Sequence, residues 1–336
     1  MREAMLWEEA GGGRVRCRLC AHRCLIPLGG RGVCMVRENR SGKLYSLVYG
    51  RIVSHALDPV EKKPLFHFLP GTGTLSIATV GCNFRCDFCQ NYEISQLPRE
   101  HGGWIVGEEV TSEDLIFAAK STQARSISYT YTEPTIFFEF CYETGKLAAK
   151  EGLKNIFVTN GYMTEEALEE AKDWLHAATV DLKSFSEDFY RRFCGASLQP
   201  VLDTIRRMWE AGIWVEVTTL VIPGRNDSPE ELRWIAEFLM GISPDIPWHI
   251  SRFVPAYKAW DLPPTPVATL RKAREVGLSA GLRFVYLGNV PGEGEDTFCP
   301  SCGRVLVRRY GFYVLENAIL DGHCPQCGAA IPGIWR

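Results

Sequence analysis

The sequence contains no long apolar run. No window approaches the roughly 18 apolar residues that a membrane-spanning helix needs, and the opening MREAMLWEEAGGGRVRC lacks the apolar stretch of a secretory signal. Neither sign of charge predominates, because 37 Lys and Arg stand against 40 Asp and Glu, a net charge of -3. We therefore expect a cytoplasmic protein that does not associate with membranes and has no general attraction for nucleic acid.

Cysteine, in contrast, is abundant. Thirteen cysteines are many for a cytoplasmic chain, where thiols stay reduced, unless they bind metal. Only Cys141 and Cys194 stand apart from three tight groups. The groups are Cys17, Cys20, Cys24 and Cys34; then Cys82, Cys86 and Cys89; then Cys299, Cys302, Cys324 and Cys327. Such spacing predicts metal sites and argues against a disulfide framework.

Between the flanking groups, short β-branched runs alternate with amphipathic helical stretches, which is typical of a parallel sheet built from βα units. The expected strands are residues 75–80, 126–131, 155–159, 178–182, 214–222, 249–254 and 282–287. Helix starts are expected at Thr164, at Ser228 with Pro229 and Glu231 as a capping box, and at Thr265 with Pro266. The pattern predicts an α/β fold with an open or partial (β/α) barrel.

Polar motifs follow four of these strands, where the ligands of parallel sheets bind. The three-cysteine loop follows the first strand, TEPT the second, NGY the third, and DLK lies at the fourth. We therefore expect these four motifs to meet on one face. Residues 1–70 form a predicted N-terminal subdomain and lid, 71–290 the barrel, and 291–336 a C-terminal module.

The stretch TVGCNFRCDFCQNYEIS has only three clustered cysteines, one fewer than a structural zinc site takes. Three thiolates can bind three irons of a [4Fe-4S] cluster and leave the fourth iron open for another ligand. The alternatives are a zinc site completed by a distant residue, and buried cysteines without metal.

This C-x3-C-x2-C loop, with Phe88 before its last cysteine, resembles the signature of the radical S-adenosylmethionine (SAM) superfamily over residues 75–290. The resemblance implies a partial (β/α)6-type barrel and an oxygen-sensitive oxidoreductase. In that chemistry SAM chelates the open iron, and one electron from the cluster cleaves SAM to a 5′-deoxyadenosyl radical that abstracts hydrogen from a substrate. An electron donor similar to flavodoxin or ferredoxin is also implied.

Within the superfamily, the sequence most resembles the pyruvate formate-lyase activating enzymes. Their Gly-Gly-Glu-Pro stretch, which receives the SAM amino group, matches YTEP, although two glycines are replaced here. The likeness assigns SAM contacts to Phe88, Thr132, Glu133, Asn160, Asp181, Lys183 and His249. The alternatives from the residues themselves are a solvated Glu133, a structural Asp181–Lys183 ion pair, and a hydrogen-bonded core role for His249.

A narrower resemblance joins DPVEKKPLFHFLPG, CQNYEISQ and both flanking cysteine groups. This combination is similar to the radical SAM enzyme of the AmmeMemoRadiSam group. That likeness covers nearly the whole chain and implies an AMMECR-type and a Memo-type protein as partners.

The flanking groups each supply four thiols, a closed ligand set. CPSC and CPQC have the spacing of a zinc ribbon, with mononuclear iron as the main alternative. For Cys17, Cys20, Cys24 and Cys34, zinc and an auxiliary [4Fe-4S] cluster both remain open. Residues 304–312 of the ribbon carry arginines and aromatics that are compatible with RNA, although most such ribbons only stabilise a fold.

Lys62 and Lys63 lie between the first cysteine group and the barrel. They belong to a solvated surface segment or to a lid that binds an acidic substrate group, and with Tyr131 they are the candidate catalytic residues. We predict a radical SAM enzyme that abstracts hydrogen from an unidentified substrate. The alternatives are an activase of glycyl-radical enzymes and, in another class, a metal-stapled RNA-binding adaptor.

Overall fold

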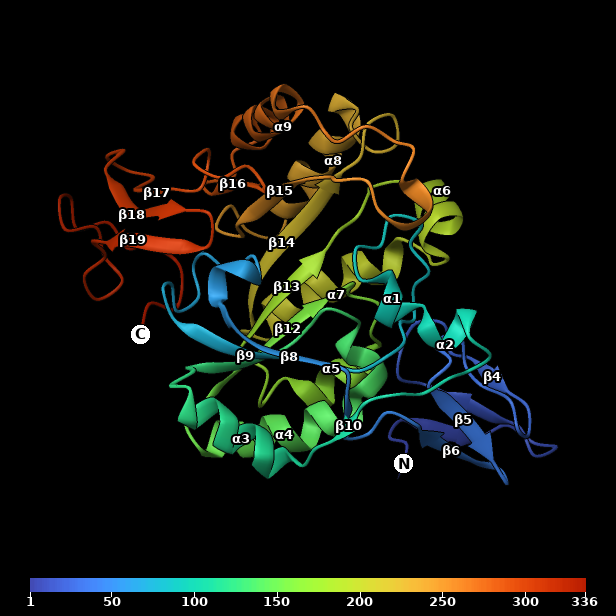
Figure 1. Cartoon of the computed structure of the whole chain (residues 1–336). Coiled ribbons are helices and arrows are strands. Elements are labelled where there is room, and N and C mark those ends of the chain that lie inside the picture. The colour runs from blue at the N-terminus through green and yellow to red at the C-terminus, as the bar shows by residue number, and fades with distance from the viewer.

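The computed structural model describes all 336 residues and centres on one eight-stranded sheet (Figure 1). Its strand order is β16-β15-β14-β13-β12-β11-β9-β8, with β9 to β16 parallel and β8 antiparallel at one edge. The strands are β8 (Ser54–Pro59), β9 (Gly73–Ala78), β11 (Ser126–Tyr129), β12 (Lys154–Thr159), β13 (Ala177–Asp181), β14 (Trp214–Val221), β15 (Trp248–Arg252) and β16 (Val285–Gly288).

Helices between the parallel strands pack on the outer face of the sheet and close it into a partial barrel (Figure 1). The helices are α1 (Tyr92–Ser95), α2 (Leu97–Glu100), α3 (Ser112–Ser121), α4 (Phe138–Lys150), α5 (Glu165–Ala171), α6 (Glu187–Phe189), α7 (Gln199–Glu210), α8 (Pro229–Met240) and α9 (Val267–Ser279). Short turns η1 (Val60–Lys62), η2 (Pro134–Phe137), η3 (Tyr190–Cys194) and η4 (Tyr257–Ala259) join them. None of the helices has the length and apolar character that crossing a membrane requires.

All seven expected strands are present, so the α/β prediction is confirmed. The predicted caps at Thr164 and Ser228 are also confirmed, because each side chain accepts a backbone N–H of its helix. The Glu231 side chain instead accepts from Ser184 and Phe185. Thr265 is not a cap: its hydroxyl bonds to the Val221 carbonyl, and α9 begins two residues later.

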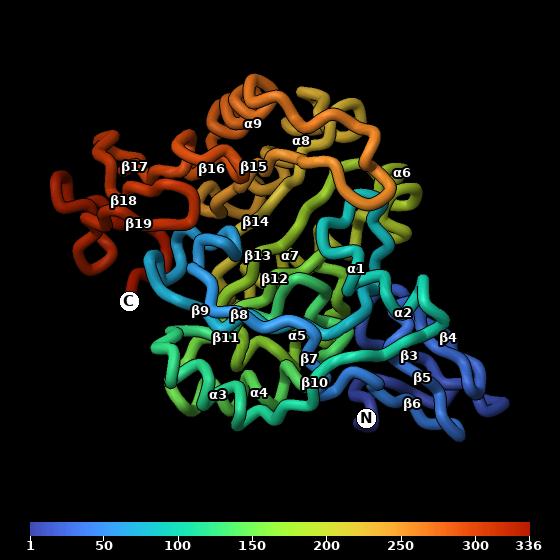
Figure 2. Tube along the Cα trace, in the orientation of Figure 1, coloured from blue at the N-terminus to red at the C-terminus, as the bar shows by residue number.

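The two flanking regions lie at opposite ends of the barrel (Figure 2). The N-terminal region builds two small sheets from β1 (Arg2–Glu3), β2 (Trp7–Glu9), β3 (Val15–Cys17), β4 (Leu25–Ile26), β5 (Arg37–Arg40) and β6 (Lys43–Ser46). A two-stranded pair joins β7 (Arg51–Ile52) to β10 (Glu108–Glu109). Residues 54–59 belong to the predicted N-terminal subdomain, yet as β8 they extend the barrel sheet.

The C-terminal module is a three-stranded antiparallel sheet beyond β16, shown in red in Figure 2. Its strands are β17 (Thr297–Phe298), β18 (Val305–Tyr310) and β19 (Tyr313–Asn317). A four-cysteine group of this module has the arrangement of a zinc-ribbon-like site. The tail then returns to residues 67–69, where Leu69 donates its N–H to the Ile334 carbonyl.

Candidate active site

A cavity of about 400 Å³ opens at the carboxyl ends of the parallel strands. It is lined by the three-cysteine loop, by the residues that follow β11 and β12, and by the ends of β13, β14 and β15. The predicted residues that line it are Lys62, Lys63, Cys82, Cys86, Phe88, Cys89, Tyr131, Thr132, Glu133, Asn160, Asp181 and Lys183. The four motifs therefore meet on one face, because each follows a parallel strand of the same sheet.

The three-cysteine loop turns its thiols toward this cavity. Cys82 Sγ accepts the Phe84 N–H at 3.3 Å, and Cys89 Sγ lies 3.3 Å from the Ser95 hydroxyl. The three sulfurs do not form a group within 4.8 Å of one another, as four sulfurs elsewhere in the chain do. Wider separation suits a multi-iron cluster, in which each cysteine binds a different iron, better than a single zinc ion.

Glu133 is a fully buried carboxylate that joins two of the strand-end loops. Its Oε1 accepts from the Thr135 N–H at 3.0 Å, the Thr135 hydroxyl at 2.6 Å and the Thr159 hydroxyl at 2.7 Å. Its Oε2 accepts the Asn160 N–H at 2.8 Å. Burial raises the pKa of this carboxyl, although these donors oppose the shift. Glu133 therefore fixes the TEPT and NGY loops while Oε2 keeps acceptor capacity toward the cavity.

Asp181 and Lys183 form an ion pair at the end of β13, with Nζ 3.0 Å from Oδ2. This geometry matches the structural alternative, yet both residues line the cavity. The Lys183 ammonium also lies 6.0 Å from the Phe88 ring centroid. Nearby, the buried Thr218 hydroxyl lines the cavity without a hydrogen-bond partner. Thiols, charged pair and unpartnered hydroxyl together fit a polar ligand such as SAM beside an iron-sulfur cluster.

Asp58, at the end of β8, bonds to three side chains that line the cavity. Its carboxylate accepts from Lys62 at 2.8 Å, from Lys63 at 2.7 Å and from the Tyr131 hydroxyl. Burial opposes ionisation of Asp58, but these three donors hold its pKa well below the usual range. Lys63 is buried, which lowers its pKa to about 8 despite the contact with Asp58. Lys63 is thus not the solvated residue of the surface-segment alternative, whereas Lys62 is half-exposed.

Tyr131 adopts a left-handed backbone conformation with φ of 63°. Bulky residues rarely take this conformation, which costs of the order of 1–3 kcal/mol. The Asn91 side chain bonds to the Tyr131 carbonyl at 2.8 Å, and the Lys63 ammonium lies 4.3 Å from the ring centroid. The strained conformation is therefore held by contacts from both sides of the cavity.

His249 does not line the cavity. Its Nε2 lies 2.6 Å from a Glu216 oxygen deeper in the barrel, and its ring stacks on Tyr286. Glu216 also accepts the backbone N–H groups of Phe66 and His67. This is the hydrogen-bonded core role, so the predicted nucleoside contact of His249 stays a prediction that the geometry does not favour.

Sequence reasoning missed three residues at this site. Asp58 carried no signal beyond its place in DPVEKK, and Phe312, which lines the cavity, comes from the C-terminal module. Cys194 carried none, because it is isolated in the sequence. Its thiol is buried, and its carbonyl accepts the N–H of Arg85, the residue before Cys86, at 2.9 Å, so Cys194 lies beside the three-cysteine loop.

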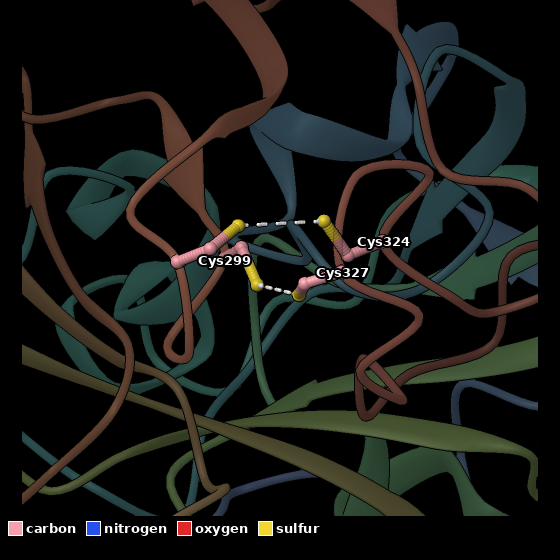
Figure 3. Close-up of side chains that lie close together, drawn as sticks. Cys299, Cys324 and Cys327 are labelled. Atoms are coloured by element: carbon pink, nitrogen blue, oxygen red, sulfur yellow. Dashed lines mark hydrogen bonds between the residues drawn. The ribbon is translucent and has the colours of Figure 1, made fainter.

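The four C-terminal cysteines form a compact tetrad (Figure 3). Cys299 and Cys327 sulfurs are 3.6 Å apart, Cys302 and Cys324 sulfurs 3.7 Å apart, and all four lie within 4.8 Å of one another. A tetrahedral zinc ion with bonds of about 2.3 Å requires sulfurs about 3.8 Å apart. The tetrad therefore fits a single metal ion, and zinc remains the predicted one.

The basic run of this module is not a continuous surface. Arg309 is buried, stacks 4.2 Å from the Phe66 ring centroid, and donates to the Phe66 carbonyl at 2.7 Å. It also lies 3.8 Å from the buried Glu61 carboxylate. Arg309 thus anchors the module to the barrel, which removes one of the cations on which an RNA-binding surface would depend.

Known proteins are similar to this chain in sequence or in fold. The radical SAM superfamily model matches residues 76–239. An uncharacterized protein of Methanocaldococcus jannaschii is 44% identical over 335 residues, 98% of this chain and 99% of its own. A putative glycyl-radical enzyme activating enzyme of the same organism is 26% identical over 228 residues, 64% of this chain and 79% of its own.

Among solved structures, a radical SAM methyltransferase from Sphaerobacter thermophilus superposes with a TM-score of 0.52 at 15% identity and covers 71% of each chain. At that identity the likeness concerns the fold alone. The predicted resemblance to radical SAM activating enzymes is confirmed. The narrower likeness to the AmmeMemoRadiSam group stays a prediction.

Proposed function

Because the chain belongs to the radical SAM superfamily and is an enzyme of that class, we propose that its cavity holds a [4Fe-4S] cluster on Cys82, Cys86 and Cys89 together with SAM. When bound and reduced, this pair supplies a 5′-deoxyadenosyl radical, which abstracts hydrogen from a substrate. The observation that carries the proposal is the convergence of the three thiols with Glu133, Asp181 and Lys183 in one cavity.

The roles of the polar residues follow from their charges. The free acceptor capacity of Glu133 Oε2 suits the SAM ammonium, and Lys183 suits the SAM carboxylate. Asp181 keeps Lys183 oriented through its 3.0 Å contact. Asn160 is fixed by Glu133 and also contacts Asn83 at 2.8 Å, beside Cys82. These contacts hold the ligand-binding groups in place before any ligand binds.

On the substrate side, we propose that Lys62 and Lys63 bind an acidic group such as a carboxylate or phosphate. Both line the cavity, and Asp58 holds their ammonium groups 2.8 and 2.7 Å from one carboxylate. Two cations face one anion there, so the pair retains net positive charge for an anionic substrate. Phe312 supplies an apolar contact to the same cavity.

The first experiment tests the radical chemistry. Protein purified without oxygen and reconstituted should contain the [4Fe-4S] signal, change that signal when SAM is added, and release 5′-deoxyadenosine after reduction. Cys86→Ala should lose all three properties, whereas Cys141→Ala, a buried cysteine outside the three groups, should keep them. Iron-loaded wild-type protein that leaves SAM intact in the presence of its substrate would contradict the proposal.

The second experiment tests the lysines. Lys62→Gln and Lys63→Met should retain the SAM-induced change in the cluster signal but lose at least tenfold in turnover of the acidic substrate. Lys172→Gln, an exposed lysine paired with Glu169, is the matched control. Equal turnover in all of these variants would rule out an acidic-substrate site at the lysines.

A second candidate is activation of a glycyl-radical enzyme, which the likeness to the activating enzyme of M. jannaschii favours. In that case the substrate is a backbone glycine of another protein. A glycyl radical in a partner, seen by electron paramagnetic resonance, would support activation. A modified small molecule with no protein radical would support the small-substrate reaction.

The implied partners remain proposals. A flavodoxin-like or ferredoxin-like donor would supply the electron, and AMMECR-type and Memo-type proteins follow only from the narrower resemblance. Co-purification of the AMMECR-type or the Memo-type protein with the tagged full chain would support these two partners. Failure of both proteins to co-purify would count against them.

A further inference from the structure

We infer that the four N-terminal cysteines hold a second [4Fe-4S] cluster, which passes electrons from an acidic donor protein to the cluster of the cavity. The role as a relay rests on the proposed function, whereas the metal assignment does not. Three features of the structure carry the inference: the arrangement of the sulfurs, their contacts with the cavity loop, and the charge around them.

The arrangement of the four sulfurs differs from that of the C-terminal tetrad. The C-terminal sulfurs gather within 4.8 Å of one another, while no three of the N-terminal sulfurs do. The N-terminal cysteines still come together, because Cys17 donates its N–H to the Cys24 carbonyl at 2.9 Å and Val33, the residue before Cys34, donates its N–H to Cys24 Sγ. Within this molecule they resemble the three cavity cysteines, which also stay apart. Four converging but separated thiolates suit the four irons of a cluster rather than one zinc ion.

A backbone N–H group points at one of these sulfurs, as one does at Cys82 in the cavity loop. Val33 donates its N–H to Cys24 Sγ at 3.4 Å. Such a donor stabilises a thiolate and tunes an iron-sulfur cluster, so Cys24 is suited to bind iron.

The N-terminal cysteines also lie directly against the residues that flank Cys82. The ring of His22, two residues after Cys20, is 2.8 Å from the Asn83 carbonyl. On the other side of Cys82, a Cβ atom on Gly81 would lie 3.0 Å from the Cys34 carbonyl, and Gly81 has φ of +96°. Only glycine permits both this conformation and this approach. Electrons therefore have a short route of packed atoms between the two cysteine groups.

Arg99 adds a third connection. Its Nη2 donates to the Val33 carbonyl at 2.8 Å and contacts the Cys82 carbonyl at 3.4 Å. One guanidinium thus joins the residue before Cys34 to the first cysteine of the cavity loop. A structural zinc site on the N-terminal cysteines would not need contacts on both sides of Cys82.

The segment that carries the N-terminal cysteines is rich in arginine, in a chain with a net charge of -3. Residues 11–40 contain seven arginines, of which Arg37 is buried against Glu139. The other six lie at the surface and pair with only three carboxylates, those of Glu8, Glu38 and Glu166, so positive charge is in excess there. Leu28 and Val33 are exposed beside the cysteines, 63% and 43% respectively. An apolar centre with a basic rim suits an acidic, one-electron donor of the flavodoxin or ferredoxin kind. The donor is oxidised by one electron, the N-terminal cluster is reduced and reoxidised, and the cavity cluster gains that electron.

The metal assignment is tested first on the full chain without its cavity cysteines, Cys82→Ala/Cys86→Ala/Cys89→Ala. After anaerobic reconstitution, we expect about four irons and four sulfides per chain, one zinc, and a reduced [4Fe-4S] resonance, against about eight irons in the wild type. No iron and two zincs in this folded variant would overturn the inference. Since this readout does not involve SAM, it is separate from any failure of the proposed function.

The complementary variant, Cys20→Ala/Cys24→Ala, covers the case in which the triple variant does not fold. Its iron content should fall from about eight to about four while the remaining cluster still responds to SAM. Unchanged iron content would overturn the assignment.

The relay is tested with the same complementary variant. Reduced flavodoxin should reduce its cavity cluster at least tenfold more slowly than in the wild type, whereas dithionite, a small reductant, should reduce both equally. Equal rates with flavodoxin would overturn the relay.

Discussion

Replacing Asp58 by Asn tests how the cavity carries its charge. Asp58 is the only carboxylate bonded to Lys63, and both side chains are buried, with 7% and 2% exposed. Asp58→Asn removes the negative charge and leaves the Lys63 ammonium beside a neutral amide. Breaking one partner out of a buried ion pair costs about 3–5 kcal/mol of folding free energy.

The cost should depend on pH, because Lys63 can lose its proton. Its pKa is already lowered to about 8 by burial, and removal of Asp58 lowers it further. Below the Lys63 pKa of both the wild type and the variant, the ammonium stays charged in both proteins, and the full loss of folding free energy appears. Between the Lys63 pKa of the variant and about pH 8, Lys63 is neutral only in the variant. In this range the loss of folding free energy shrinks by about 1.4 kcal/mol for each pH unit. Above about pH 8 both are neutral, and the smaller loss stays constant.

The assay is thermal unfolding of the anaerobic, metal-loaded protein at pH 6.5 and 8.5. Taking about 2 °C per kcal/mol for a chain of this size, we expect a lower midpoint by about 6 °C at pH 6.5 and a clearly smaller drop at pH 8.5. The matched control is Asp188→Asn, whose exposed pair with Arg192 should contribute less than about 1 kcal/mol. An equal drop at both pH values, or one no larger than that of the control, would refute this account.

Three further predictions concern the cavity wall, the three-cysteine loop and the interior of the barrel. Tyr131→Phe removes the hydroxyl that bonds to Asp58 and should lower substrate-dependent 5′-deoxyadenosine formation about tenfold without weakening SAM binding measured by calorimetry. The Cys194 thiol lowers the pKa of Cys86, so Cys194→Ala should lower the cavity cluster's reduction potential in an anaerobic redox titration; an unchanged potential would count against an influence of Cys194 on the cluster. Burial lowers the pKa of His67 to about 4 from 6.5, so the unfolded chain binds a proton between these values that the folded chain does not. Stability should fall as the pH drops from 6.5 to 4, and His67→Asn should flatten this fall by up to about 3 kcal/mol in urea titrations at a series of pH values.

The barrel and the cavity were predictable because both follow from local patterns. Seven β-branched runs became seven parallel strands, and parallel strands place their following loops at one edge. The motifs TEPT, NGY and DLK could thus be assigned to the three-cysteine cavity from their positions after strands alone. Glu133 illustrates the limit of that reasoning, since the sequence gives no sign that it accepts from both Thr159 and Asn160.

What the sequence did not reveal depends on contacts between distant segments. β8 precedes the barrel in the chain and reads as a lid, yet it pairs antiparallel with β9 and brings Asp58 to Lys63 and Tyr131. Arg309 has the composition of a surface cation, but Phe66 and Glu61 lie against it in the interior. Contacts between segments far apart in the sequence determine where β8 and Arg309 lie. The periodicity of a single segment does not encode such contacts.

Tyr131 connects the strain in the backbone with substrate choice. The activating enzymes that this chain resembles have glycine in this stretch, and glycine takes a left-handed conformation without strain. Here a tyrosine with φ of 63° occupies that place, and its ring lies under Lys63 while its hydroxyl bonds to Asp58. Strain of this kind persists only where surrounding contacts enforce it, and it is concentrated at functional sites. The ring lines the cavity and its contacts are with Lys63 and Asp58, so Tyr131 should discriminate among substrates rather than affect SAM.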